Sequence, residues 1–281
     1  MDGGGGKGNR KNGAGAKFGT GYCDAQCPHD IKWMGGEANV DGHYGMCCIE
    51  MDIWEANRRA SAFTTHPCSV EGAYRCEGVD CGDVCDKDGC DFNAFRMGRQ
   101  HFYGVGQDFA VDTTKPMTVV TQFLTTDGTD QGDLAEIRRF YVEEGRSIAN
   151  ADTNVQSMPV GNSITDPFCS AQKRAFQTSD SHTAKGGLKT MGEAFDRGLV
   201  LVMSLWDDGA TQMRWLDSSF PAGEQRGKPG VARGPCDGST SSSAQVRQEH
   251  SSASVKYMNI MYGEIGSTTS ADGRRAGVLL V

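Results

Sequence analysis

The stretch Glu50-Met51-Asp52-Ile53-Trp54-Glu55 places three carboxylates within six residues, among apolar side chains that are typical of a β-strand. Because side chains alternate between the two faces of a strand, Ile49, Met51 and Ile53 are expected to point into a core and the first two acids away from it. Strict alternation would send Glu55 inward as well. The two consecutive apolar residues before it predict a one-residue β-bulge, which returns Glu55 to the side of the other acids.

Three carboxylates on one face of a strand predict glycoside hydrolysis. With the bulge, the backbones of Glu50 and Glu55 lie about four strand steps apart, roughly 13 Å, and long side chains that lean together narrow the gap between the carboxyls. A gap of about 5–5.5 Å is the geometry of a retaining mechanism, in which one carboxylate attacks the anomeric carbon and the other protonates the leaving oxygen. Neighbouring negative charge keeps that proton in place, and Asp52 is placed to share a hydrogen bond with Glu50. The alternative is a solvated acidic strand edge, which is common for short acidic patterns.

Segments on both sides of this stretch carry a longer pattern. They are Gly19-Thr-Gly-Tyr-Cys-Asp-Ala-Gln-Cys-Pro28, Cys47-Cys-Ile-Glu-Met-Asp-Ile-Trp-Glu-Ala-Asn57, Thr65-His-Pro-Cys68 and Gly263-Glu-Ile-Gly-Ser-Thr-Thr269. In these segments the chain resembles family 7 of the glycoside hydrolases, the cellobiohydrolases and endoglucanases that cut β-1,4-glucan. The resemblance implies an all-β fold, a concanavalin A-like jelly-roll sandwich of two antiparallel sheets whose long loops form a glucan-binding cleft or tunnel.

The resemblance also implies the catalytic roles. It implies that Glu50 is the nucleophile and Glu55 the acid/base, that Asp52 is their helper, and that His66 neighbours the acid/base where the leaving sugar binds. We expect no cofactor and no metal.

Substrate-binding residues are implied in the same way. Trp206 and Trp215 match the glucose platforms that flank the scissile bond, although a Trp at the end of an apolar strand is more often part of a core. The polar contacts match on the substrate side at Tyr22, Asp24, Gln26 and Lys32, and on the product side at Asp88, Asp91, Arg96 and Arg233. The alternative for these polar residues is a solvated surface with ordinary salt bridges.

The chain has 11 cysteines, an odd number at a density that is typical of an oxidising compartment. The resemblance implies the pairs Cys23–Cys48, Cys27–Cys47, Cys68–Cys85, Cys76–Cys81 and Cys90–Cys169, and it leaves Cys236, whose family partner lies upstream of Met1. The alternative is a zinc site at the closely spaced cysteines, either Cys23 and Cys27 or Cys76, Cys81 and Cys85.

Extent and composition bound the class of protein. The family pattern begins upstream of Met1, so residues 1–281 are expected to be the C-terminal two-thirds of a single catalytic domain, with a Gly-rich loop at 1–18 and no carbohydrate-binding module. A net charge of −8 argues against a nucleic-acid partner, and no apolar run approaches the length of a membrane span. No signal peptide is visible, but the cysteines predict a secreted protein, and we expect a monomer.

Apolar patterning predicts the remaining elements. A helix is expected at Leu188–Asp196, with Gly198 as its stop signal. Strands are expected at Met117–Phe123, Ile137–Val142, Leu199–Trp206 and Val255–Tyr262, where β-branched and aromatic residues concentrate.

Loop lengths bear on how the enzyme would cut cellulose. Segments 39–47 and 81–90 are short compared with those of the tunnel-forming relatives, which opens the roof of the cleft. Segment 220–236, with Arg233, keeps the length that is typical of cellobiohydrolases, although Phe220 stands where a Tyr is usual. We therefore expect a cellobiohydrolase that releases mainly cellobiose. The alternatives are an endo-β-1,4-glucanase of the same family and, from another class, an inactive truncated or carbohydrate-binding product.

Overall fold

The computed structural model describes residues 22–31, 33–34, 37–205, 207–238, 242–269 and 277–280. Its strands are β1 (Trp33–Met34), β2 (Glu37–Ala38), β3 (Tyr44–Cys47), β4 (Glu50–Ala56), β5 (Ser61–His66), β6 (Tyr74–Glu77), β7 (Cys90–Asn93), β8 (Tyr103–Gly104), β9 (Val111–Asp112), β10 (Met117–Thr125), β11 (Leu134–Glu143), β12 (Arg146–Ala149), β13 (Ser163–Ile164), β14 (Val255–Met258) and β15 (Gly277–Leu280). Its helices are α1 (Asp166–Phe176), α2 (Ser181–Ala184), α3 (Gly187–Arg197), α4 (Arg214–Asp217) and α5 (Ser243–Glu249), with a 3₁₀ turn over Gly78–Gly82. The predicted loop at 1–18, Lys32 and Trp206 lie outside the described residues.

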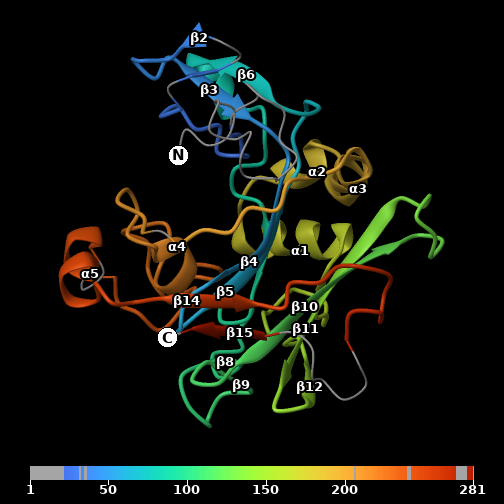
Figure 1. Cartoon of the computed structure of the whole chain (residues 1–281), viewed down its shortest axis with the longest axis vertical. Helices are drawn as coiled ribbons and strands as arrows, with labels where there is room; N and C mark the ends of the chain where they lie inside the picture. Colours follow the sequence, from blue (N-terminus) through green and yellow to red (C-terminus); the bar gives the residue numbers. More distant parts are fainter. Residues whose placement is uncertain are drawn as a thin grey trace.

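Two sheets position the acidic stretch. β4, β5 and β7 form an antiparallel sheet with β5 in the centre, and a larger sheet has the order β12-β11-β10-β15-β14, with β13 also on β11. In Figure 1, β4 and β5 run through the middle of the molecule and the helices α1–α3 lie beside them. Among the paired strands of the described residues, only β8 and β9 run parallel.

One apolar core joins the two sheets to the helices α1 and α3. The ring of Phe92 on β7 stacks on those of Phe63 on β5 and Phe168 on α1, with centroids 5.7 Å and 5.3 Å away. Ile137 of β11 and Leu188 of α3 belong to the same buried cluster. Burial of such large side chains provides most of the stabilisation of a fold of this kind.

The patterned elements form largely where the sequence predicts them. β10 and β11 contain the strands expected at Met117–Phe123 and Ile137–Val142, and α3 contains the helix expected at Leu188–Asp196. Gly198 is its C-cap, at φ 93°. The strand expected at Val255–Tyr262 ends at Met258.

Two apolar predictions are wrong. Residues 199–205 form no strand, and their apolar side chains are between 47% and 68% exposed because no strand of the described residues pairs with them. Ile53, expected in a core, is 39% exposed. Its side chain and this unpaired segment line the same hollow, so neither packs against a covering layer of described residues.

The sequence reading also missed α1. Thr165 is its N-cap and accepts a hydrogen bond from the Phe168 amide at 3.2 Å, and Pro167 stands in its first turn. This pairing of a Thr cap and an early Pro was the available signal. Across the helices of the described residues, none has both the length and the apolar character needed to cross a membrane.

Disulfides connect the elements around β4. The five pairs are Cys23–Cys48, Cys27–Cys47, Cys68–Cys85, Cys76–Cys81 and Cys90–Cys169, as the resemblance implies. The zinc alternative is wrong, because each cysteine that it would use forms one of these disulfides. Cys236 is the free thiol of the described residues. In the chain-entropy picture, the pair separated by 79 residues contributes about 4.5 kcal/mol to stability and the pair separated by 5 residues about 2 kcal/mol.

Candidate active site

The pairing of β4 with β5 contains the predicted bulge. Asp52 pairs with Thr64, and the next pair is Glu55 with Ala62. The two β4 residues between the acids therefore stand opposite one β5 residue, Phe63, which is the two-against-one arrangement of a β-bulge.

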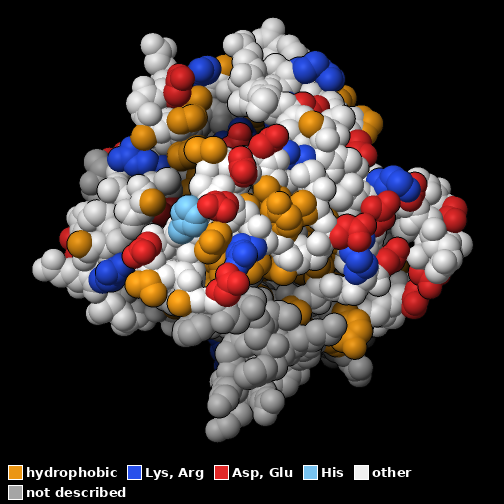
Figure 2. Space-filling view, turned by 90° about the horizontal axis from the view of Figure 1, so that it is seen from above, with side chains coloured by type: hydrophobic (Ala, Val, Ile, Leu, Met, Phe, Trp, Pro, Cys, Tyr) orange, Lys and Arg blue, Asp and Glu red, His pale blue; other side chains and the backbone are white. Residues whose placement is uncertain are grey.

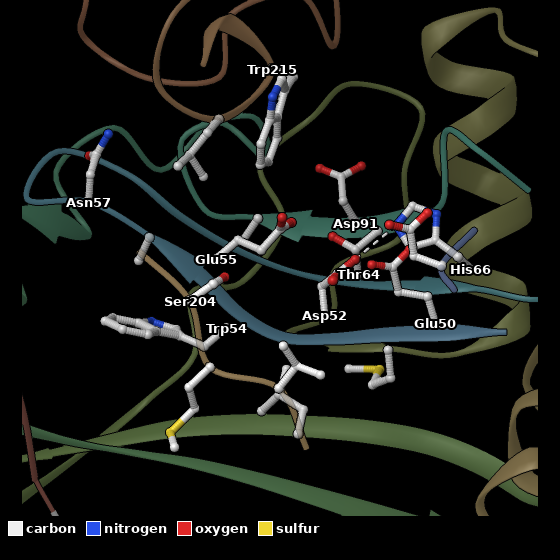
Figure 3. Close-up of a pocket in the computed structure, with 18 of the residues that line it drawn as sticks. Glu50, Asp52, Trp54, Glu55, Asn57, Thr64, His66, Asp91, Ser204 and Trp215 are labelled. Carbon is white, nitrogen blue, oxygen red and sulfur yellow. Dashed lines mark ion pairs between the residues drawn. The ribbon is translucent and has the colours of Figure 1, made fainter. Parts of the chain in front are cut away.

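The bulge brings the three acids to one side of the strand. Figure 3 shows Glu50, Asp52 and Glu55 rising from the same face of β4, while Trp54 points away from the opposite face. Without the extra residue, the period of two would place Glu55 on the face opposite to Glu50 and Asp52.

Burial disfavours the charged form of Glu50, and two specific contacts partly offset this effect. Oε2 of Glu50 accepts a hydrogen bond from the Ala25 amide at 2.9 Å. Burial and the charge of Asp52 raise its pKa to about 8, while the charge of His66 and the Ala25 amide act in the opposite direction. The Cys23–Cys48 and Cys27–Cys47 disulfides tie the Ala25 loop to the segment that leads into β4.

Glu55 lies in a less favourable environment for a charge. Burial, followed by the charge of Asp52, raises its pKa well above the ordinary value, and the charges of Glu50 and Asp91 add to the effect. The charge of His66 acts against them. No backbone amide of the described residues donates to Glu55 as Ala25 does to Glu50. Of the two carboxyls, Glu55 therefore retains its proton to higher pH.

His66 is buried and pairs with Asp52. Its Nδ1 lies 2.7 Å from the carbonyl oxygen of Asp86 and donates to it, and its Nε2 lies 3.0 Å from Oδ2 of Asp52. Burial alone would lower its pKa, but the hydrogen bond and charge of Asp52, with the charge of Glu50, raise it to about 10. The hydrogen bond expected between Asp52 and Glu50 is thus replaced by one to His66.

The predicted substrate-side residues lie next to Glu50. Tyr22, Asp24 and Gln26 line the same hollow as the acids. Tyr22 donates a hydrogen bond to Asp24, and Oδ1 of Asp24 accepts the Gln26 amide at 2.8 Å. Burial, together with the negative charges of Asp24 and Glu50, raises the pKa of Tyr22, so its hydroxyl stays protonated.

The predicted product-side residues form a charged cluster. The buried carboxylate of Asp91 pairs with Arg96, and its Oδ2 lies 3.9 Å from Nη1 of Arg233. Burial raises the pKa of Asp91, but the two arginine charges outweigh this effect and lower it. Burial and the charge of Arg96 lower the pKa of Arg233 to about 10. The remaining member, Asp88, is exposed.

Trp215 stands above Glu55 in Figure 3, on the short helix α4. Its Nε1 donates to Oδ2 of Asp208 at 3.1 Å. The helix is joined to the end of β4 by the Asn57 side-chain amide, which donates to Oδ2 of Asp217 at 2.7 Å. The other predicted platform, Trp206, lies outside the described residues.

The site occupies a large hollow. Its volume is about 3340 Å³, and the acids, Trp215 and the product-side cluster all line it. Figure 2, the view from above, shows acidic side chains beside a recess in the surface of the molecule. Sequence reasoning missed the Ala25 amide and the Asp86 carbonyl, because backbone groups leave no mark in a sequence.

Known proteins share this arrangement of the chain. A model of glycosyl hydrolase family 7 matches residues 1–269. A family 7 cellobiohydrolase from Daphnia pulex is 50% identical, with a TM-score of 0.80 over 85% of this chain and 59% of that one. A native endocellulase from Humicola insolens is 41% identical, with a TM-score of 0.69 over 85% and 55%. A cellobiohydrolase from Melanocarpus albomyces, complexed with cellotetraose, is 35% identical, with a TM-score of 0.74 over 85% and 58%.

The chain therefore spans 55–59% of the length of these relatives. The TM-scores confirm the predicted fold class, a strand-dominated jelly-roll sandwich. The family match and the identities together show that this chain belongs to glycosyl hydrolase family 7.

Proposed function

We propose that this protein hydrolyses the β-1,4-glucosidic bonds of cellulose with retention of configuration, acting as a cellobiohydrolase that releases mainly cellobiose. The observation that carries the proposal is the set of three carboxylates that the bulge in β4 aligns on one face. Their unequal environments support different roles for the two glutamates, as a retaining mechanism requires.

Glu50 is the proposed nucleophile. A nucleophile must be ionised when the sugar binds. The Ala25 amide and the nearby charge of His66 stabilise the carboxylate form against burial and the charge of Asp52, which raise the pKa of Glu50 to about 8. In the first step, Glu50 would attack the anomeric carbon as the glycosidic C–O bond breaks, which forms a glycosyl ester.

Glu55 is the proposed acid/base. It must bring a proton to the leaving oxygen, and burial beside two negative carboxylates keeps that proton on Glu55. In the second step the ionised Glu55 would take a proton from water, which attacks the ester and regenerates Glu50.

Asp52 and His66 form the proposed electrostatic partner of both glutamates. The imidazolium is positioned by the Asp86 carbonyl and the Asp52 carboxylate. The positive charge of His66 lowers the pKa of both glutamates, and the negative charge of Asp52 raises the pKa of both. Among the described residues, the contact that distinguishes the two roles is the Ala25 amide, which donates to Glu50.

Glucan binding would use one aromatic and one charged surface. Trp215 offers a flat ring above Glu55, on which the C–H face of a glucose ring can stack. Arg96, Arg233 and Asp91 line the same hollow and offer charged hydrogen-bonding groups to sugar hydroxyls.

The cellobiohydrolase assignment rests on this product-side cluster and on the higher identity to the Daphnia pulex enzyme. The specific observation in favour of an endoglucanase is the large hollow around the acids, together with the short segments 39–47 and 81–90 of the sequence. Five disulfides support a secreted protein, since such bonds persist in oxidising compartments.

The Glu50→Gln substitution tests the nucleophile. It keeps the shape of the side chain but removes the attacking charge, so kcat on an aryl cellobioside should fall by at least about 10³-fold. Binding of cellobiose, measured by calorimetry, should change little. The matched control is Glu77→Gln on β6, an exposed carboxylate outside the site. Hydrolysis at an undiminished rate in Glu50→Gln would refute the assignment of the nucleophile. If the unsubstituted protein binds cellobiose but does not hydrolyse the aryl cellobioside, the carbohydrate-binding alternative is favoured.

The Asp52→Asn substitution tests the ion pair with His66. In the unsubstituted protein the pKa of His66 is about 10, so the imidazolium should persist at pH 8. In Asp52→Asn the burial effect dominates, and the pKa should fall below 6.5, which leaves a neutral ring at pH 8. Side-chain ¹⁵N chemical shifts measure this directly, with His66→Gln to assign the signal. A neutral His66 at pH 8 in the unsubstituted protein would contradict the account.

Product analysis on amorphous cellulose tests the mode of cutting. Release from chain ends should give nearly pure cellobiose while the mean chain length of the insoluble residue falls slowly. A rapid fall in the mean chain length with few soluble sugars would contradict the cellobiohydrolase assignment and favour the endoglucanase. Arg233→Ala should lower the cellobiose share, because the residue belongs to the product-side cluster.

A further inference from the structure

We propose that Arg139 is a positioning residue that maintains the β4 bulge and thereby aligns Glu55 with Glu50. The inference rests on the proposed function for the roles of the two glutamates. Arg139 lies in the middle of β11, in the sheet that faces β4, and is only 3% exposed.

The guanidinium of Arg139 contacts both strands that form the bulge, β4 and β5. Its Nη2 donates a hydrogen bond to the carbonyl oxygen of Ile53, the first of the two bulge residues on β4. Its carbon Cζ lies 4.5 Å from the ring centroid of Phe63, the β5 residue opposite the bulge. A second donor, Nε, reaches Oγ1 of Thr121 on β10 at 3.2 Å and fixes the orientation of the group.

The cost of burying this charge argues for a specific role. Among the described residues Arg139 has no carboxylate within ion-pairing distance. The hydroxyl of Tyr141 is a favourable neutral neighbour, and the Nη1 atom has no hydrogen-bond acceptor. A buried charge without a counter-charge is unfavourable, and an apolar side chain of similar length would fill the space at lower cost. A carbonyl in a bulge has lost its regular ladder partner, and a strong charged donor suits it.

The position of the bulge makes the effect selective. Glu55 follows the bulge, whereas Glu50 precedes it and is fixed separately by the Ala25 amide. If the Ile53 carbonyl is released, Glu55 moves relative to the scissile oxygen while Glu50 remains in place. Loss of Arg139 should therefore impair proton donation by Glu55 more than nucleophilic attack by Glu50.

Leaving-group dependence measures this selectivity. A dinitrophenolate leaves without a proton, whereas a phenolate needs one, so Arg139→Met should lower kcat/KM about 10²-fold on phenyl cellobioside and less than about threefold on 2,4-dinitrophenyl cellobioside. Azide, which attacks the glycosyl ester without needing a base, should accelerate turnover of the dinitrophenyl substrate and yield β-cellobiosyl azide. Arg139→Lys keeps the charge without the planar fork and should show a smaller defect of the same kind.

The matched control is Arg138→Met. This neighbour is exposed on the other face of β11 and pairs with Glu136 by hydrogen bonds of 2.8 Å and 2.7 Å. It should leave both substrates and the azide response unchanged. Equal losses on the two substrates in Arg139→Met and Arg139→Lys would show general destabilisation and overturn the proposal, as would activity unchanged in both.

Hydrogen exchange provides a readout that does not depend on hydrolysis. The amides of residues 53–56 should exchange at least about tenfold faster in the Arg139 variants than in Arg138→Met, because the bulge has lost its donor. Equal exchange would refute the positioning role even if activity falls. If the unsubstituted protein cleaves neither substrate, the proposed function fails, while the exchange rates still decide whether Arg139 maintains the bulge.

Discussion

The bulge opposite Phe63 is the constraint on which the site depends. A regular strand presents every second side chain to one face, so it cannot align acids separated by two and then three positions. The extra residue resolves this mismatch and turns Glu55 toward Asp52 and Glu50. The surrounding structure stabilises this irregular backbone from several sides, with two disulfides before the strand, the Asn57–Asp217 hydrogen bond after it, and Arg139 behind it.

Alignment alone would leave two equivalent carboxyls, and the electrostatic environment separates them. Both glutamates are buried beside Asp52 and near the His66 imidazolium, and of the two, Glu50 also receives a backbone amide from the described residues. His66 can supply a positive charge because Asp52 accepts from one ring nitrogen and the Asp86 carbonyl from the other. The same polypeptide segment thus provides a carboxyl with a backbone donor and, across the bulge, a buried carboxyl that favours the neutral acid.

The sequence predicted much of this arrangement for physical reasons that can be named. Consecutive apolar residues before Glu55 indicated the bulge, and the family resemblance implied the fold and the five disulfides. The sequence did not predict that residues 199–205 would lack a strand partner. An apolar pattern indicates a strand, but it does not indicate which element covers that strand. Backbone groups such as the Ala25 amide leave no side-chain signal. Arg139 did leave one, since alternation places it on the buried face of β11 with Ile137 and Tyr141.

Trapping of the glycosyl–enzyme ester tests the central claim, that the bulge directs Glu50 to attack and Glu55 to transfer protons. A cellobioside with fluorine at C2 and a dinitrophenolate leaving group slows the breakdown of the ester, so that peptide mass mapping can locate it. We expect one cellobiosyl-sized adduct, on the side chain of Glu50. An adduct on Asp52 or Glu55, or turnover of the reagent without any adduct, would contradict the account.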